Sequence, residues 1–338
     1  MARNLVKIGI NGFGRIGRNA YRATLEMRGF GKEFDIVAVN DVAPVDSLAY
    51  LLKYDSVYGK LDNEVKVEGS GISVDGRRLE ITQLKDPGEI PWRKFGVDVV
   101  IESTGLFTDK EKAAKHLLGG AKKVIISAPS KDADVMLVLG VNMEMYDRPK
   151  HNVISMGSCT TGSLAPPAKV LNDKFGIERG TLLTIHAYTA DQRITDLPHK
   201  DFRRGRAAGL SIIPTSTGAA KAIGKVIPAL DGKMNGISMR VPTPCGSVTD
   251  ITFDSKVDVT AEELNKALLE ASQGKMKGIL GYCTDPIVST DIIGDPHSAV
   301  IDSLLTMVVQ KRFAKVFSWY DNEWGYANRL VELAPKLL

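Results

Sequence analysis

The sequence predicts an α/β fold in which a doubly wound parallel sheet is followed by a second, α+β domain with a mixed or antiparallel sheet. The chain has 338 residues, which is long for a single hydrophobic core. Its first half alternates short apolar strands with helical segments, the pattern of a parallel sheet covered by helices on both faces. Its second half has longer β segments and few helices.

The expected elements of the first half follow from β-branched runs and helical periodicity. Glycines at positions 29 and 31 should end the first helix. The predicted elements are strands at 6–10, 35–39, 97–102 and 123–127 and helices at 15–28 and 109–118. This domain is expected to span residues 1–157 and to be joined by a C-terminal helix at 322–338.

The second domain is expected to span residues 158–321. Its predicted elements are strands at 182–186, 236–240, 247–253 and 313–319 and a helix at 261–271. Residues 190–218 show little periodicity. A loop of that length within a compact domain is usually functional or held by a partner subunit.

The composition is that of an ordinary globular protein, with 43% hydrophobic and 25% charged residues. A net charge of +4 suits an anionic small molecule and does not indicate a nucleic-acid partner. The N-terminus lacks a signal peptide's apolar core, and no apolar run approaches the roughly 20 residues that span a bilayer. The three cysteines form neither a disulfide framework nor a zinc pattern. We expect a soluble, cytoplasmic protein with no membrane contact and no metal site.

A glycine-rich motif indicates dinucleotide binding. Gly12, Gly14 and Gly17 fit the G-x-G-x-x-G pattern between a predicted strand and a predicted helix. The first glycine permits a tight turn, the second lets the backbone approach a pyrophosphate, and the third allows close packing of helix on sheet. Alone, the triplet is equally compatible with a plain turn; its setting favours a Rossmann-type domain.

Residues around the motif extend the predicted cofactor site. The amides of Arg15 and Ile16 open the helix, whose dipole favours the anionic pyrophosphate. Asp41 ends the second strand, where a carboxylate accepts hydrogen bonds from the adenosine ribose and repels a 2′-phosphate. The sequence therefore predicts NAD as cofactor and leaves NADP open.

Cys159 is the candidate nucleophile. It precedes a helical run at 164–174, and Pro166 and Pro167 should lie in the first turn of that helix. A thiol at a helix N-terminus has its pKa lowered towards the reactive thiolate. His186, at the end of a predicted strand, is the candidate general acid/base. The alternatives are a space-filling cysteine and an ordinary core or surface histidine.

Arginines and hydroxyl groups in and after the loop suit phosphate recognition. The basic residues are Arg193, Arg203, Arg204, Arg206 and Arg240. Thr189, Thr217 and Gly218 lie nearby in sequence, and guanidinium groups combined with hydroxyls and backbone amides bind phosphate well. For Arg193, Arg203 and Arg206 a solvated face or a subunit contact is the preferred interpretation.

The whole chain resembles the phosphorylating glyceraldehyde-3-phosphate dehydrogenases of glycolysis. The resemblance is carried by ordered segments from end to end: residues 10–18, 51–56, 158–161, 196–201, 217–221, 240–244 and 319–326. It implies that Cys159 attacks the aldehyde to give a hemithioacetal, that His186 takes the proton, and that hydride passes to NAD. Inorganic phosphate then cleaves the resulting thioester to 1,3-bisphosphoglycerate.

The resemblance also implies roles for individual residues. It places Thr189 and Arg240 on the substrate's phosphate, and it places a second set around the attacking phosphate: Ser158, Thr160, Arg204, Thr217 and Gly218. Asn322 should bind the nicotinamide carboxamide, and Lys85 and Ser127 match positions that touch the cofactor. The usual state of the family is a homotetramer.

Departures from the family pattern cluster near the nucleophile: Met156, Gly162, Ser163 and the pair Cys245-Gly246. A glycine in a first helical turn costs roughly 1 kcal/mol of helix propensity against alanine. Val42 and Ala43 also differ from the common residues after Asp41. Two other functions remain open at this point: an erythrose-4-phosphate dehydrogenase, in which water ends the thioester, and a non-catalytic dinucleotide-binding relative.

Overall fold

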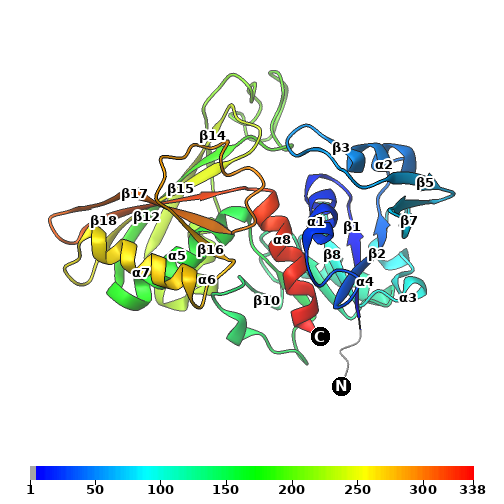
Figure 1. The fold of residues 1–338 in the computed structure, drawn as a ribbon, viewed down its shortest axis with the longest axis horizontal. Helices are drawn as coiled ribbons and strands as arrows, with labels where there is room; N and C mark the ends of the chain where they lie inside the picture. The colour runs from blue at the N-terminus through cyan, green and yellow to red at the C-terminus, as the bar shows by residue number, and fades with distance from the viewer. Residues whose placement is uncertain (1–4) are drawn as a thin grey trace. The chain divides into compact units, whose positions relative to one another are not determined.

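The computed structural model describes residues 5–338. Two compact units make up the chain, and each contains its own sheet (Figure 1). The first unit comprises the chain up to Leu137 together with Glu144–Gly157 and Ala327–Leu338. The second unit comprises Val138–Met143 and Ser158–Tyr326.

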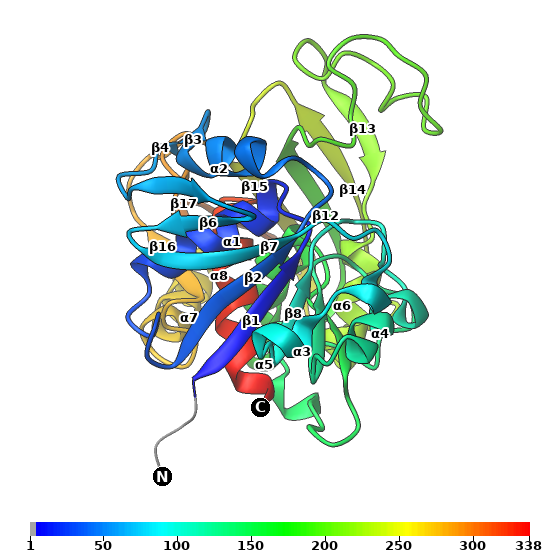
Figure 2. The ribbon, with the colours of Figure 1, turned by 90° about the vertical axis from the view of Figure 1, so that its right-hand side faces the viewer.

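A nine-stranded sheet forms the first unit. Its strands are β1 (Val6–Asn11), β2 (Phe34–Asn40), β5 (Val65–Glu68), β6 (Gly71–Val74), β7 (Arg77–Thr82), β8 (Val99–Glu102), β9 (Lys123–Ile126), β10 (Val135–Met136) and β11 (Val153–Ser155). They lie in the order β10-β11-β9-β8-β1-β2-β7-β6-β5. Pairing is parallel from β10 to β7 and antiparallel in the β7-β6-β5 edge. Figure 2 shows β1, β2 and β7 running alongside one another. The carboxyl ends of β1, β2 and β8 therefore meet at one edge.

The remaining elements of the first unit are helices and a small hairpin. They are α1 (Arg15–Glu26), α2 (Val45–Lys53), α3 (Trp92–Phe95), α4 (Lys110–Leu118), β3 (Tyr54–Asp55) and β4 (Gly59–Lys60). The helix α8 (Trp324–Leu333) closes the chain. Trp92 is fully buried in an apolar cluster with Ala38, Val97 and Val100, and this cluster fixes α3 against the sheet.

A seven-stranded mixed sheet forms the second unit. Its strands are β12 (Ile177–Ala187), β13 (Ile213–Ser216), β14 (Met234–Val241), β15 (Ser247–Ser255), β16 (Leu280–Cys283), β17 (Ala299–Val309) and β18 (Phe313–Tyr320), in the order β13-β14-β12-β15-β18-β17-β16. Three helices pack on it: α5 (Cys159–Phe175), α6 (Ala219–Val226) and α7 (Ala261–Gln273). The predicted fold class is confirmed.

Most predicted elements are present within a few residues of their expected ends. The structure differs in the loop predicted at 190–218, because Ile213–Ser216 pairs with β14 as the edge strand β13. The unpredicted elements include strands β5, β6, β7, β10, β11, β16 and β17 and helices α2, α3 and α6. Strands β5 and β17 carry exposed apolar residues that break the alternation expected of a half-buried strand. Among the described residues, no helix combines the length and apolarity needed to cross a membrane.

Candidate active site

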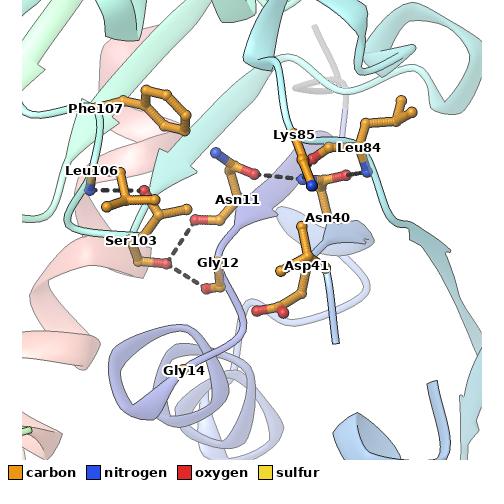
Figure 3. Close-up of a pocket in the computed structure, with 12 residues that line it drawn as sticks. Asn11, Gly12, Gly14, Asn40, Asp41, Leu84, Lys85, Ser103, Leu106 and Phe107 are labelled. Carbon is orange, nitrogen blue, oxygen red and sulfur yellow. Dashed lines mark hydrogen bonds between the residues drawn. The ribbon is translucent and has the colours of Figure 1, made fainter. Parts of the chain in front are cut away.

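A cavity of about 510 Å³ lies where β1, β2 and β8 end in the first unit. Gly12, Gly14, Asp41 and Lys85 line it, as the sequence led us to expect of cofactor-site residues. Figure 3 shows Asn11, Asn40, Asp41 and Lys85 around this space, with the Ser103 hydroxyl bound to the main chain at positions 11 and 12. Ligands of parallel sheets bind at this edge.

The three motif glycines occupy different surroundings. Gly12 has φ +90°, and a Cβ there would lie 2.7 Å from the backbone nitrogen of Thr104. At Gly17 a Cβ would lie 2.2 Å from the carbonyl oxygen of Gly12. At Gly14 a Cβ would meet nothing within 4 Å. Gly14 thus leaves an open cradle beside the N-terminus of α1, which is where the negatively charged pyrophosphate of a dinucleotide fits.

These contrasting surroundings give a paired prediction. Gly14→Ala should weaken NAD binding about tenfold, because the methyl group projects into the cradle, and should leave the melting temperature unchanged. Gly17→Ala should instead destabilise the fold by roughly 1–3 kcal/mol, because its methyl group overpacks against the Gly12 carbonyl. Calorimetric titration with NAD and thermal unfolding distinguish the two. Equal losses of stability in both variants would contradict this assignment.

The other predicted cofactor residues are placed as follows. Asp41 accepts hydrogen bonds from the amides of Phe13 (2.7 Å) and Ala43 (2.9 Å), so its carboxylate is fixed at the cavity. Arg15 and Ile16 begin α1, and Arg15 forms an ion pair with Asp55 (2.5 Å). Ser127 does not line this cavity; its amide donates to the Glu102 carbonyl oxygen (2.9 Å).

A buried polar network that the sequence did not reveal supports this cavity. Trp92 Nε1 donates to His116 Nδ1 (3.0 Å), so the ring proton lies on Nε2, which donates to Glu102 Oε2 (2.9 Å). The same carboxylate accepts from the Asn11 side chain (2.5 Å) and the Thr104 amide (2.9 Å). Asn11 and Thr104 line the cavity, so the buried carboxylate of Glu102 fixes the position of two lining residues.

In the second unit, Cys159 is the first residue of α5. Ser158 is the N-cap, and its hydroxyl accepts from the Thr161 amide (3.1 Å) in a capping box. The helix thus begins five residues before the predicted run. Pro166 and Pro167 lie in its interior, not in its first turn, so that prediction was wrong. The capping box formed by Ser158 and Thr161 therefore marks the start of this helix better than the position of the prolines does.

The structure brings Cys159 and His186 together. Cys159 Sγ lies 3.4 Å from His186 Nε2. His186 Nδ1 lies 2.6 Å from the Ala187 carbonyl oxygen; in the tautomer that donates the Nδ1 proton to this oxygen, the Nε2 lone pair faces the thiol. The ring meets Tyr320 edge-on, with 6.0 Å between centroids. The imidazole is therefore oriented to take a proton from sulfur.

Burial dominates the electrostatics of this pair. It raises the pKa of the Cys159 thiol, although Arg240 and hydrogen bonds from Thr160 act in the opposite direction. Burial, reinforced by the charge of Arg240, lowers the pKa of His186 to about 3. The lowered thiol pKa expected at the helix N-terminus is therefore wrong in direction, because desolvation of the thiolate outweighs the dipole. Both shifts favour the neutral forms of the thiol and the imidazole.

Arg240 adjoins this pair through the sheet. His186 on β12 and Arg240 on β14 are register partners in a parallel pairing, so both side chains lie at the same level. Arg240 Nη1 contacts His186 Nδ1 and donates to the Ala187 carbonyl (3.1 Å). Its Nε is buried without a hydrogen-bond acceptor among the described residues. A buried donor of this kind suits an anionic ligand.

Thr189 and Arg204 meet through a residue that the sequence did not single out. Asp191 accepts from the Thr189 hydroxyl and pairs with Arg204 Nη1. Arg204 Nε also lies 3.5 Å from a carboxylate oxygen of Asp201. Arg193 Nε donates to the Pro198 carbonyl oxygen (3.3 Å), and Arg206 Nε donates to a carboxylate oxygen of Asp196 (3.0 Å), both within the same loop.

The hydroxyl groups expected around a phosphate have structural partners. Ser158 caps α5, and the Thr160 hydroxyl lies 3.1 Å from the Tyr320 hydroxyl. The Thr217 hydroxyl accepts from the Ala219 amide (3.2 Å), and Gly218 is the N-cap of α6 with open space at its Cβ position. The N-cap residue Gly218 has no side chain to cap α6, so the amides that follow Ala219 are available for an anion.

Asn322 is buried, and its side-chain oxygen accepts from the Ser247 hydroxyl (2.9 Å). Ser247 also accepts from the Ala187 amide (3.1 Å), next to His186. Cys245, one of the residues that differ from the family pattern, donates from its thiol to Asp321 Oδ1 (3.2 Å). Gly246 has φ +86°, and a Cβ there would lie 2.2 Å from the Ser289 carbonyl, so glycine is required in this local structure. A Cβ at Gly162 would meet nothing within 4 Å.

Comparisons with known proteins agree with both halves of the chain. Residues 6–110 match the family model for the NAD binding domain of glyceraldehyde 3-phosphate dehydrogenase, and residues 158–322 match the model for its C-terminal domain. Glyceraldehyde-3-phosphate dehydrogenases of Priestia megaterium and Bacillus subtilis are each 57% identical over 97% of both chains. That of Geobacillus stearothermophilus is 55% identical over the same share. The predicted resemblance is confirmed.

Proposed function

The chain belongs to the glyceraldehyde-3-phosphate dehydrogenase family, and we propose that it oxidises glyceraldehyde 3-phosphate to 1,3-bisphosphoglycerate with NAD and inorganic phosphate. The single observation that carries the proposed chemistry is the 3.4 Å contact between Cys159 Sγ and His186 Nε2 at the start of α5. The open cradle at Gly14 and the carboxylate of Asp41 support a bound NAD.

The first half of the reaction uses the neutral thiol and imidazole. As the Cys159 sulfur attacks the aldehyde carbon, its proton moves to His186 Nε2 and from there to the substrate oxygen, which gives a hemithioacetal. His186 then removes the hydroxyl proton while the carbon loses hydride. NAD, when bound, supplies the acceptor for that hydride. The product on Cys159 is a thioester.

The second half returns the sulfur to its thiol form. An oxygen of inorganic phosphate attacks the thioester carbon, the carbon–sulfur bond breaks, and the product leaves as an acyl phosphate. The protonated His186 returns its proton to the departing sulfur. Protonated imidazole is a strong acid in this buried setting, which favours that transfer.

We assign the substrate's own phosphate to Thr189 and Arg240, and the attacking phosphate to a second set of residues: Ser158, Thr160, Arg204, Thr217 and Gly218. The unmatched Nε of Arg240 and the open N-terminus of α6 support these positions. Asn322 is assigned to the nicotinamide, with Lys85 and Ser127 as further cofactor contacts. The remaining parts of the proposal are an NAD-binding domain of residues 1–157 plus 322–338, a catalytic domain of 158–321, a homotetramer and a cytoplasmic location. The three cysteines form no disulfide, which suits a reducing compartment.

The test is the dependence of NADH formation on phosphate. With glyceraldehyde 3-phosphate and NAD, continuous NADH production should require inorganic phosphate, because without it the thioester accumulates after a single turnover. Erythrose 4-phosphate should be the poorer substrate. Sustained turnover without phosphate would overturn the acyl-phosphate product and favour hydrolysis of the thioester.

A further inference from the structure

Asp191 lies between two side chains that the proposed function assigns to different phosphate groups. One carboxylate oxygen accepts the hydroxyl proton of Thr189, and the other pairs with Arg204 Nη1. Thr189 is assigned to the phosphate of the substrate and Arg204 to the attacking phosphate. The carboxylate of Asp191 therefore contacts one residue assigned to each of the two phosphate groups.

The carboxyl of Asp191 is ionised and reachable. Although burial acts to raise it, its pKa is lowered, because Thr189, Arg204 and Arg240 stabilise the charged form. Its side chain is 43% exposed, whereas that of Arg204 is 21% exposed. An anion arriving from solvent can therefore reach the contact that Asp191 makes.

Two buried hydrogen-bond donors of neighbouring residues are not paired with Asp191 or with any other acceptor among the described residues. Arg240 Nε and Gln192 Nε2 are buried with no acceptor among the described residues. Gln192 is only 7% exposed, and its side-chain oxygen accepts from the Thr189 amide (3.2 Å), which fixes the amide group beside Thr189. A carboxylate offers two oxygens and one charge, whereas a phosphate group offers three free oxygens and up to two charges.

We propose that Asp191 determines anion specificity by acting as an internal competitor. In the substrate-free protein its carboxylate holds Thr189 and Arg204, and a phosphate group must displace it in order to bind. This inference rests on the proposed function. A doubly charged phosphate group displaces the single charge of Asp191, whereas a carboxylate ligand such as acetate gains nothing over it. The site therefore selects phosphorylated ligands over simple carboxylates.

The test measures anion binding without turnover. Calorimetric titration of the full-length protein with inorganic phosphate, in the presence of NAD, should show about tenfold tighter binding in Asp191→Asn than in the wild type, because a like charge within a few ångströms is removed. Acetate should compete with phosphate in Asp191→Asn and not in the wild type. Asp191→Ala should change in the same direction. In steady state the KM for glyceraldehyde 3-phosphate should fall in Asp191→Asn without a rise in kcat.

Asp196→Asn is the matched control, because Asp196 lies in the same loop and pairs with Arg206 (3.0 Å), which has no assigned ligand. Its phosphate affinity should equal that of the wild type. Unchanged or weaker phosphate binding in both Asp191 variants would show that Asp191 only supports Thr189 and Arg204, and would overturn the inference. A wild-type protein that binds phosphate but forms no NADH would instead contradict the proposed function.

Discussion

Replacing Cys159 by alanine should abolish NADH formation, with kcat falling by at least about 10⁴-fold. Neither of the other two cysteines can take its place at the start of α5. Cys245 is buried and donates a hydrogen bond to Asp321, and the Cys283 thiol donates a hydrogen bond to the Asp285 carbonyl oxygen. The loss of the nucleophile removes both the hemithioacetal and the thioester. Steady-state assays with saturating aldehyde, NAD and phosphate measure the effect.

The control for this variant is Cys283→Ala, which removes a partly exposed thiol from the same unit and should retain wild-type activity. NAD binding by Cys159→Ala, followed by calorimetry, should remain close to that of the wild type, because the glycine cradle and Asp41 lie in the other unit. Undiminished NADH formation by Cys159→Ala would remove this residue from the mechanism.

Replacing His186 by glutamine should lower kcat by roughly 10²–10⁴-fold, the usual contribution of a general acid/base. Glutamine retains a hydrogen-bonding group but cannot take the thiol proton at Nε2. The rate of alkylation of Cys159 by iodoacetamide should fall as well, since the neutral thiol loses its proton acceptor. His151→Gln is the control and should leave both rates unchanged. The His151 imidazole accepts a hydrogen bond from the Asp147 amide (3.1 Å) and takes no part in the proposed reaction.

The same substitution should change the pH dependence of stability. The pKa of His186 is about 3 in the folded protein and about 6.5 in the unfolded chain. Its stabilising contribution is therefore fully present above pH 6.5 and is lost as pH falls towards 3, because only the unfolded chain binds the proton. The slope is at most about 1.4 kcal/mol per pH unit. Urea unfolding between pH 4 and 7 should show a shallower slope in His186→Gln; identical slopes would mean that the imidazole titrates normally when folded.

Local patterns predict much of this fold because they coincide with tertiary structure. The β-branched run at Val6 and the strand that ends at Asn40 are buried on both faces, so apolar continuity marks them. The glycine motif is local as well, and its meaning depends only on the strand before it and the helix after it. The interior prolines of α5 show the limit, since the Ser158–Thr161 cap and packing on the sheet override helix propensity.

Residues joined over long sequence distances could not be predicted in the same way. Glu102 at the end of β8 and His116 in α4 form a buried pair only because the fold brings the two side chains together. Asp191 is one of many acidic residues, and its significance comes from the loop fold that places it between Thr189 and Arg204. The thiol pKa was mispredicted for a related reason: the helix position of Cys159 is visible in the sequence, but its desolvation is not.

The register between β12 and β14 has a consequence for redesign. His186 and Arg240 are fixed relative to one another by eight consecutive partner positions, whereas Thr189, Asp191 and Arg204 depend on the irregular chain that follows β12. Proton transfer thus depends on the sheet, whereas recognition is divided between Arg240 on the sheet and the residues of the irregular chain. Grafting a new segment between positions 189 and 212 should retarget the enzyme to aldehydes with other anionic groups, while the rigid sheet keeps the acid–base chemistry intact.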